Sequence, residues 1–242
     1  MNLLAGWWSQ RAALAVLESM MLWSAVTIAL YLVARHFHRR WSRWWTAPII
    51  LTPLLLIAIT VSSHTSYSVY INGTHWLIAL LGPATVAFAV PIYRQREVIR
   101  RHWLVLAAGV LVGSGTAMLS AWGLAGMLGL EGSLRLSLLP RSISTPFAMT
   151  VSGEIGGVPD LTAVFVILTG VFGAAFGASI LYWMPLRSTM ARGALFGMGA
   201  HAVGSNRAHQ IDRDEGAIAG LVMVLAGIVN VLAAPLLAHF LR

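Results

Sequence analysis

The chain of 242 residues is 58% hydrophobic and only 10% charged, and it contains no cysteine. Soluble domains carry about 25% charged residues, so this composition excludes a water-soluble fold, and the lack of cysteine excludes disulfides, thiolate metal sites and thiol catalysis. The basic residues, all arginines, lie between hydrophobic runs, which argues against a nucleic-acid-binding face despite the net charge of +8.

At about 20 residues per crossing, the length allows roughly six to eight membrane-spanning helices in one polytopic domain covering residues 1–242. The first half predicts spans over residues 12–34, 47–61, 76–93 and 103–130. Arginines cluster at residues 35–43 and 94–101, whereas the polar stretch 62–75 has none. Because cytoplasmic loops are enriched in basic residues, this alternation predicts that both clusters are cytoplasmic and that the N-terminus is outside.

The second half is less regular. Residues 131–160 are too polar for a simple span and rich in Pro and Gly, which predicts a broken or re-entrant helix. Spans over residues 161–184, 193–204 and 216–241 follow, the middle one short. With 131–160 re-entrant, we expect about seven crossings and a cytoplasmic C-terminus; if that stretch crosses fully, every later loop inverts.

Several predicted spans carry glycines four residues apart. Small residues at this spacing let helices approach closely in lipid, where van der Waals contact replaces the hydrophobic effect. We therefore predict close helix packing at these pairs: Gly109 and Gly113, Gly173 and Gly177, Gly193 and Gly197, Gly216 and Gly220.

Three apolar segments are interrupted by Gly or Pro and carry polar residues at membrane depth. Interrupted helices expose backbone amides at a half-helix N-terminus, which suits an anionic group, and hydroxyls with a nearby arginine would complete a carboxylate site. We predict a site for a small organic anion, without cofactor or metal. Its candidate residues are Pro83, Thr85, Arg141, Ser142, Ser144, Thr145, His201, Ser205, Asn206 and Arg207.

Each candidate residue taken alone also fits a structural role. Arg141 and Arg207 can extend to the membrane interface, and His201 can be a packed, hydrogen-bonded residue. The coincidence of three broken segments favours a site. Enzyme motifs are absent, and the loose GxGxxA match at residues 197–202 follows no strand, so we do not expect an enzyme.

Five ordered blocks of the sequence resemble the signature blocks of the LrgB/CidB family. They are LGPATVA at 81–87, LPRSISTPFAM at 139–149, IGGVP at 155–159, AHAVG at 200–204 and EGA at 215–217. The similarity runs from about residue 77 to the C-terminus, and the first 75 residues share only hydropathy with the family. Arg141 stands where lysine is common, and Ser205 and Asn206 stand where threonine and alanine are common.

The resemblance implies a multi-pass protein of the bacterial inner membrane, encoded with a small holin-like partner of the LrgA/CidA type. The family is described as a holin/antiholin-like system controlling murein hydrolase export and lysis, and also as a carrier of small carboxylates. Its plastid relative is a glycolate/glycerate translocator, and bacterial members are linked to pyruvate or acetate.

These descriptions lead to three hypotheses. The broken segments favour a permease for pyruvate, lactate, acetate, glycolate or glycerate, because a carrier needs a polar site at the membrane midplane. The alternative is a holin/antiholin-like regulator, and a third is a scaffold that acts only through its partner. For the permease we expect an elevator-like arrangement, with residues 1–75 as scaffold and 76–242 as the core with broken helices, and a homodimer as the commonest closed assembly.

Overall fold

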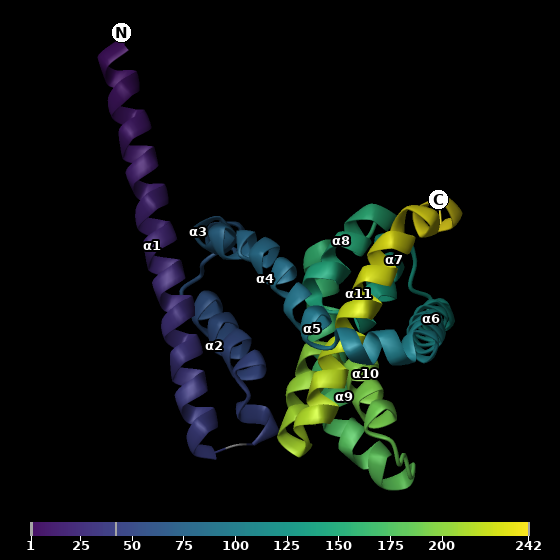
Figure 1. Ribbon diagram of the computed structural model, residues 1–242. Helices are drawn as coiled ribbons and strands as arrows, with labels where there is room; N and C mark the ends of the chain where they lie inside the picture. The colour runs from purple at the N-terminus through teal and green to yellow at the C-terminus, as the bar shows by residue number, and fades with distance from the viewer. Residues whose placement is uncertain (1, 42, 242) are drawn as a thin grey trace. The chain divides into compact units, whose positions relative to one another are not determined.

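The computed structural model describes residues 2–41 and 43–241, and every regular element in these ranges is a helix (Figure 1). The predicted all-α fold is therefore confirmed. Residue contacts divide the chain into two compact units, with the boundary between Pro83 and Ala84. The prediction that the N-terminus lies outside the cell and the C-terminus in the cytoplasm concerns Met1 and Arg242, which lie outside the described residues.

Five helical stretches of the described chain are long and apolar enough to cross a membrane: Leu17–Trp41, Tyr67–Arg94, Arg96–Met127, Pro159–Trp183 and Arg213–Leu241. They correspond to five of the seven expected crossings. The other two are α2 (Pro48–Ser62), which has only 15 residues, and α10 (Thr189–Ile211), which is interrupted at His201. The count of seven therefore stays a prediction.

The first unit contains α1 (Asn2–Trp41), the 3-10 helix η1 (Trp44–Thr46), α2 and α3 (Tyr67–Ala79). Residues 62–75, expected to form a loop, are mostly helical, and their helix packs on α1. The Ser24 hydroxyl donates to the carbonyl oxygen of Gly73 at 3.0 Å and accepts from the Trp76 indole at 2.7 Å. The rings of Trp23 and Tyr70 meet edge to face at 5.6 Å. This contact explains why a polar segment continues as helix.

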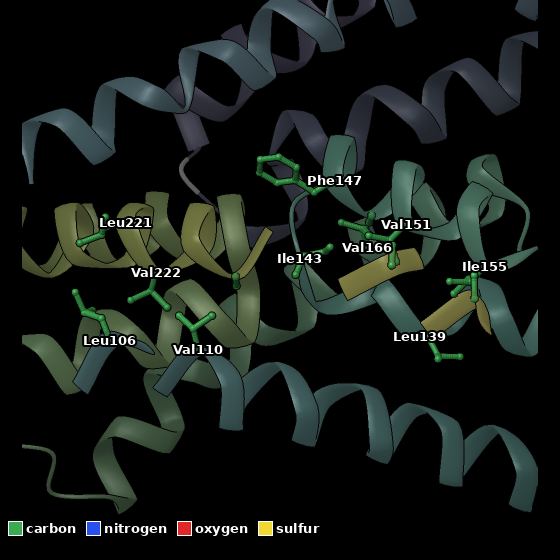
Figure 2. Close-up of a cluster of buried hydrophobic side chains, with 14 of the residues drawn as sticks. Leu106, Val110, Leu139, Ile143, Phe147, Val151, Ile155, Val166, Leu221 and Val222 are labelled. Atoms are coloured by element: carbon green, nitrogen blue, oxygen red, sulfur yellow. The ribbon is translucent and has the colours of Figure 1, made fainter. Parts of the chain in front are cut away.

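The second unit is built around α11 (Arg213–Leu241), the most deeply buried of the five long apolar helices of the described chain. Figure 1 shows α11 beside α8 (Thr145–Ile155) and α10, and it also contacts α5 (Ala89–Arg94) and α6 (Arg96–Met127). Figure 2 shows the shared core, in which Leu106 and Val110 of α6 lie on the side of Val222. The remaining elements of this unit are α7 (Gly132–Leu138), η2 (Leu139–Ser142) and α9 (Pro159–Trp183), and α4 (Leu81–Ala87) spans the boundary between units.

Close approach at the paired glycines is confirmed for most of them. A Cβ at Gly193 would lie 2.7 Å from the carbonyl oxygen of Glu215, and one at Gly177 would lie 2.6 Å from the Phe196 ring. A Cβ would also clash with main-chain or ring atoms at Gly173, Gly197 and Gly216, but at Gly113 only with the flexible side chain of Met198, and Gly109 and Gly220 have no atom within 4 Å. The tight packing of α10 between α9 and α11 therefore depends on glycine.

One buried ion pair joins the N-terminal parts of α10 and α11. The Arg192 Nε atom lies 2.7 Å from the Glu215 Oε1 atom, and the Glu215 side chain is 7% exposed. The Asp212 carboxylate caps α11 by accepting from the backbone amides of Asp214 and Glu215 at 2.8 and 3.0 Å. The turn between the two helices is thus fixed by charge and capping.

Candidate functional site

The first break in a helix lies between α7 and α8. Pro140 within η2 lacks an amide donor, and Pro146 stands at the second position of α8, where a helix tolerates proline because the amide there has no intrahelical partner. Between the two prolines, Ile143 and Ser144 are extended, with φ of −120° and −64° and ψ of 169° and 147°. Because the first amides of a helix have no intrahelical partner, α8 begins with free donors at this break.

The second break lies inside α10, at His201. Its φ of 39° and ψ of −122° interrupt the helix, and this conformation is rare for any residue except glycine. Gly204 packs so closely on the carbonyl oxygen of Phe196 that a Cβ at this position would overlap it. In a straight helix, residues eight positions apart are separated by about 12 Å along the axis. The two halves of α10 therefore fold sharply toward each other at His201.

The two breaks meet. The imidazole of His201 hydrogen-bonds to the main chain of Arg141, and the His201 residue is only 2% exposed. A Cβ at Gly170 of α9 would lie 2.7 Å from the Cε1 atom of His201, so the ring rests directly on this glycine. The Nε2 atom of His201 and the hydroxyl of Ser144 are buried without a hydrogen-bond partner. Polar groups of two broken helices are thus gathered in one buried region.

Arg141 extends from this junction into a cavity of about 490 Å³ between α6 and α9. Its Nη1 atom donates to the Thr169 hydroxyl at 3.4 Å. Among the described residues, no carboxylate lies within ion-pair distance of Arg141, since the ion pairs found join other arginines. The guanidinium is half-buried, so its charge lacks a protein counter-ion beside a mostly apolar wall.

A second, smaller cavity lies on the other side of the first break. It measures about 10 Å³, the size of roughly one water molecule, and its polar lining comes from Ser114, Ser142 and Asn230. The Asn230 Nδ2 atom donates to the Ser114 hydroxyl at 2.9 Å and to the carbonyl oxygen of Ala226 at 2.7 Å. Because both amide hydrogens are used, the Asn230 Oδ1 atom remains as an acceptor.

The structure brings together five of the ten predicted site residues: Arg141, Ser142, Ser144, Thr145 and His201 all lie at the two breaks. Ser205 lies one turn further along α10, where its hydroxyl donates to the carbonyl oxygen of His201 at 2.9 Å. Asn206 and Arg207 are exposed, and Arg207 donates to the Gln210 side chain at 3.2 Å. Pro83 and Thr85 lie in α4 and line neither cavity.

Four residues of this region were not predicted: Ser114, Thr169, Gly170 and Asn230. The strongest sequence signal was at Asn230, an uncharged amide in the middle of an apolar run, where a polar residue needs a partner. Thr169 and Gly170 sit in a helix of uniformly high hydropathy, so their position beside the breaks depends on tertiary packing alone.

Comparison with known proteins identifies the family of this chain. The LrgB-like family model matches residues 27–240. This chain belongs to that family. The resemblance drawn from the five sequence blocks is therefore confirmed. The expectation that the first 75 residues share only hydropathy with the family is wrong for residues 27–75, which the family model also matches.

Relatives cover nearly the whole chain. YwbG of Bacillus subtilis is 38% identical over 216 residues, which are 89% of this chain and 96% of YwbG. YxaC of the same organism is 33% identical over 227 residues, 94% of this chain and 96% of YxaC. The holin-like protein CidB of Staphylococcus aureus is 28% identical over 212 residues, 88% of this chain and 93% of CidB. No solved structure gives a significant match. With its apolar helices, the chain is a multi-pass membrane protein of the bacterial LrgB-like family.

Proposed function

We propose that the protein is a permease for small organic anions of the pyruvate, lactate, acetate, glycolate or glycerate class. The observation that carries this proposal is the meeting of two broken helices at Arg141 and His201. Broken helices are tolerated in a membrane where they line a cavity, and their exposed amides and dipoles suit an anionic substrate.

In this proposal each residue at the breaks has a distinct role. Arg141 binds the carboxylate by a bidentate ion pair, since its guanidinium has no carboxylate partner in the described chain. The N-terminus of α8, with the hydroxyls of Ser144 and Thr145, contributes amide and hydroxyl donors. His201 positions the Arg141 main chain and holds the two breaks together.

The division of the chain into two units supports an elevator-like mechanism. We propose that the first unit acts as the scaffold and that the second, which contains both breaks, carries the substrate. The arginine clusters at residues 35–43 and 94–101 favour a cytoplasmic location for both, with the N-terminus outside and the C-terminus inside the bacterial inner membrane. A homodimer is the simplest closed assembly.

Similarity to the holin-like protein CidB favours one alternative. In it, the protein regulates murein hydrolase export and lysis together with a small LrgA/CidA-type membrane partner. A lesion-forming system needs mainly helix surfaces that oligomerise, whereas a permease needs the buried polar junction around Arg141.

Reconstitution into proteoliposomes separates these functions. We expect the wild-type protein to accumulate labelled pyruvate, lactate, glycolate or glycerate without leaking an encapsulated dye. Arg141→Ala should abolish uptake, and Arg141→Lys should retain part of it because the charge remains but bidentate pairing is lost. Arg96→Ala, on the surface of α6, is the matched control and should leave uptake unchanged.

Three outcomes would contradict the permease. Dye leakage without selective uptake would support the lesion-forming alternative. Uptake only after co-reconstitution with the small partner would support a scaffold. Equal uptake by wild type and Arg141→Ala would remove the proposed site.

A further inference from the structure

The cavity that Arg141 enters has walls of a different chemistry from the junction itself. Leu124 and Ala125 of α6 face Leu168 and Phe172 of α9, and the polar side chains at its lining are Arg141 and Thr169. A positively charged group at one end of an apolar cavity favours a ligand that has an anionic group at one end and an apolar chain at the other.

The volume of the cavity points the same way. About 490 Å³ lies within the range of small-molecule pockets. At about 30 Å³ per heavy atom, as in liquid water, a three-carbon acid fills on the order of 150–180 Å³. Such an acid, bound to Arg141, would leave most of the apolar wall uncovered by the ligand, including Phe172 and Phe176, which are 58% and 59% exposed. An alkyl chain transferred from water to this wall would gain free energy.

Hydroxyl groups would gain little at these walls. A hydroxyl transferred from water into an apolar site without a hydrogen-bond partner costs free energy, whereas a methylene gains it. Besides Arg141, the Thr169 hydroxyl is the only polar side-chain group among the described lining residues, so hydroxyls along the tail of a ligand would have few partners. The lining therefore discriminates against glycerate and in favour of an alkyl chain.

We propose that this cavity binds monocarboxylates carrying an unbranched or branched alkyl chain of roughly four to six carbons, in preference to hydroxylated two- and three-carbon acids. The carboxylate pairs with Arg141 and the chain lies between α6 and α9. This inference rests on the proposed carboxylate site and places its preferred substrates beyond the two- and three-carbon acids named above.

Binding in lipid nanodiscs, measured by isothermal titration calorimetry, tests the inference apart from transport. The probes are acetate, butyrate, hexanoate and glycerate, with empty nanodiscs as the blank for partition into lipid. From butyrate to hexanoate we expect the affinity to rise about fourfold for each methylene, and glycerate to bind more weakly than butyrate. Equal affinities along the series, or tighter binding of glycerate, would overturn the proposal.

Filling the cavity gives the structural control. Ala121→Leu, at a buried lining position of α6, should remove the gain with chain length while leaving acetate binding within twofold. Ala108→Leu adds the same side chain at an exposed position of the same helix outside the cavity, and should change neither. If Ala121→Leu fails to fold, Leu168→Asn, at a wall position 48% exposed, should weaken hexanoate selectively. A chain-length series unchanged by the cavity variant would place the alkyl chain elsewhere and overturn the proposal.

Two further results separate this inference from its basis and from a lipid ligand. If affinity rises with chain length but no acid is taken up, the cavity proposal is supported and the permease proposal is contradicted. If acids are taken up but affinity does not change with chain length, the permease is supported and the cavity proposal is contradicted. Mass spectrometry of the purified protein tests the other source of an anionic amphiphile. A tightly held anionic lipid that hexanoate cannot displace would show that the cavity is a lipid site and would overturn the proposal.

Discussion

The two breaks that meet at His201 have different causes. Between α7 and α8, Pro140 removes an amide donor and Pro146 is preset for the first turn of a new helix, so local chemistry favours an interruption here. At His201 there is no proline or glycine, and the residue adopts a positive φ of 39°. The second break is therefore imposed by its surroundings, namely Gly170, the Arg141 main chain and the close approach of Gly204 to Phe196. A break encoded locally should tolerate substitution better than one that depends on packing.

The largest effect is expected at Gly204. Gly204→Ala places a methyl group against the carbonyl oxygen of Phe196, so the fold of α10 at His201 must open. We expect a loss of about 3 kcal/mol or more in the free energy of unfolding, measured by denaturation in mixed micelles.

Gly220→Ala is the control for this substitution. Gly220 lies in α11, and a methyl group added there would have no atom within 4 Å, so alanine should leave stability unchanged or raise it by up to about 1 kcal/mol. Similar losses for both variants would show that glycine acts through general helix effects and not through the second break.

A second prediction concerns which of two substitutions at His201, to glycine or to alanine, gives the more stable protein. Within a regular helix, alanine is more stable than glycine by about 1 kcal/mol. At φ 39° and ψ −122° the order should invert, because glycine adopts this conformation without strain and alanine does not. We expect His201→Gly to be more stable than His201→Ala by about 1 kcal/mol or more in the same unfolding assay.

Both His201 variants lose the ring that bonds to the Arg141 main chain, so their difference isolates the backbone. Ala202, exposed in the following half of α10, provides the comparison: Ala202→Gly should cost about 1 kcal/mol. An alanine variant at 201 that matches or exceeds the glycine variant would mean that the backbone there is not strained.

The proline break should respond less. Pro146→Ala removes a residue preset for the first turn of α8, which costs about 0.4–1 kcal/mol, chiefly through greater freedom of the unfolded chain. The break itself should persist because Ile143 and Phe147 remain anchored in the core. Uptake by the variant should stay close to wild type, and a loss as large as that of Gly204→Ala would contradict the local origin of this break.

This difference explains how much the sequence reveals. Pro140, Pro146 and the hydroxyls beside them identify the first break directly, and the apolar runs identify the long helices. The segment around His201 was also predicted to be broken, from its glycines and polar residues, but nothing local predicts the positive φ of His201 itself. Thr169 and Asn230 lie near the breaks because α9 and α11 pack against them, and no local sequence pattern predicts this packing.

The same limit explains the predictions at the edges of the site. Pro83 and Thr85 share the composition of the other broken segments but lie in α4, which lines neither cavity. The segment over 62–75 was expected to be an external loop, yet residues 67–75 are helical and pack against Trp23 and Ser24 of α1 within the first unit. Polarity along the chain indicates where partners are needed, and only the fold decides which partners are present.

The smallest effect is expected at Arg207, the second arginine of the predicted site. It is exposed and donates only to Gln210 one turn away, whereas Arg141 enters the cavity without a counter-ion. Arg207→Ala should therefore change stability by less than about 0.5 kcal/mol and leave proteoliposome uptake within twofold of wild type. If it abolished uptake as Arg141→Ala is expected to do, the substrate would have to contact the outer half of α10. The site would then extend beyond the junction of the two breaks, and packing at His201 would be only one part of it.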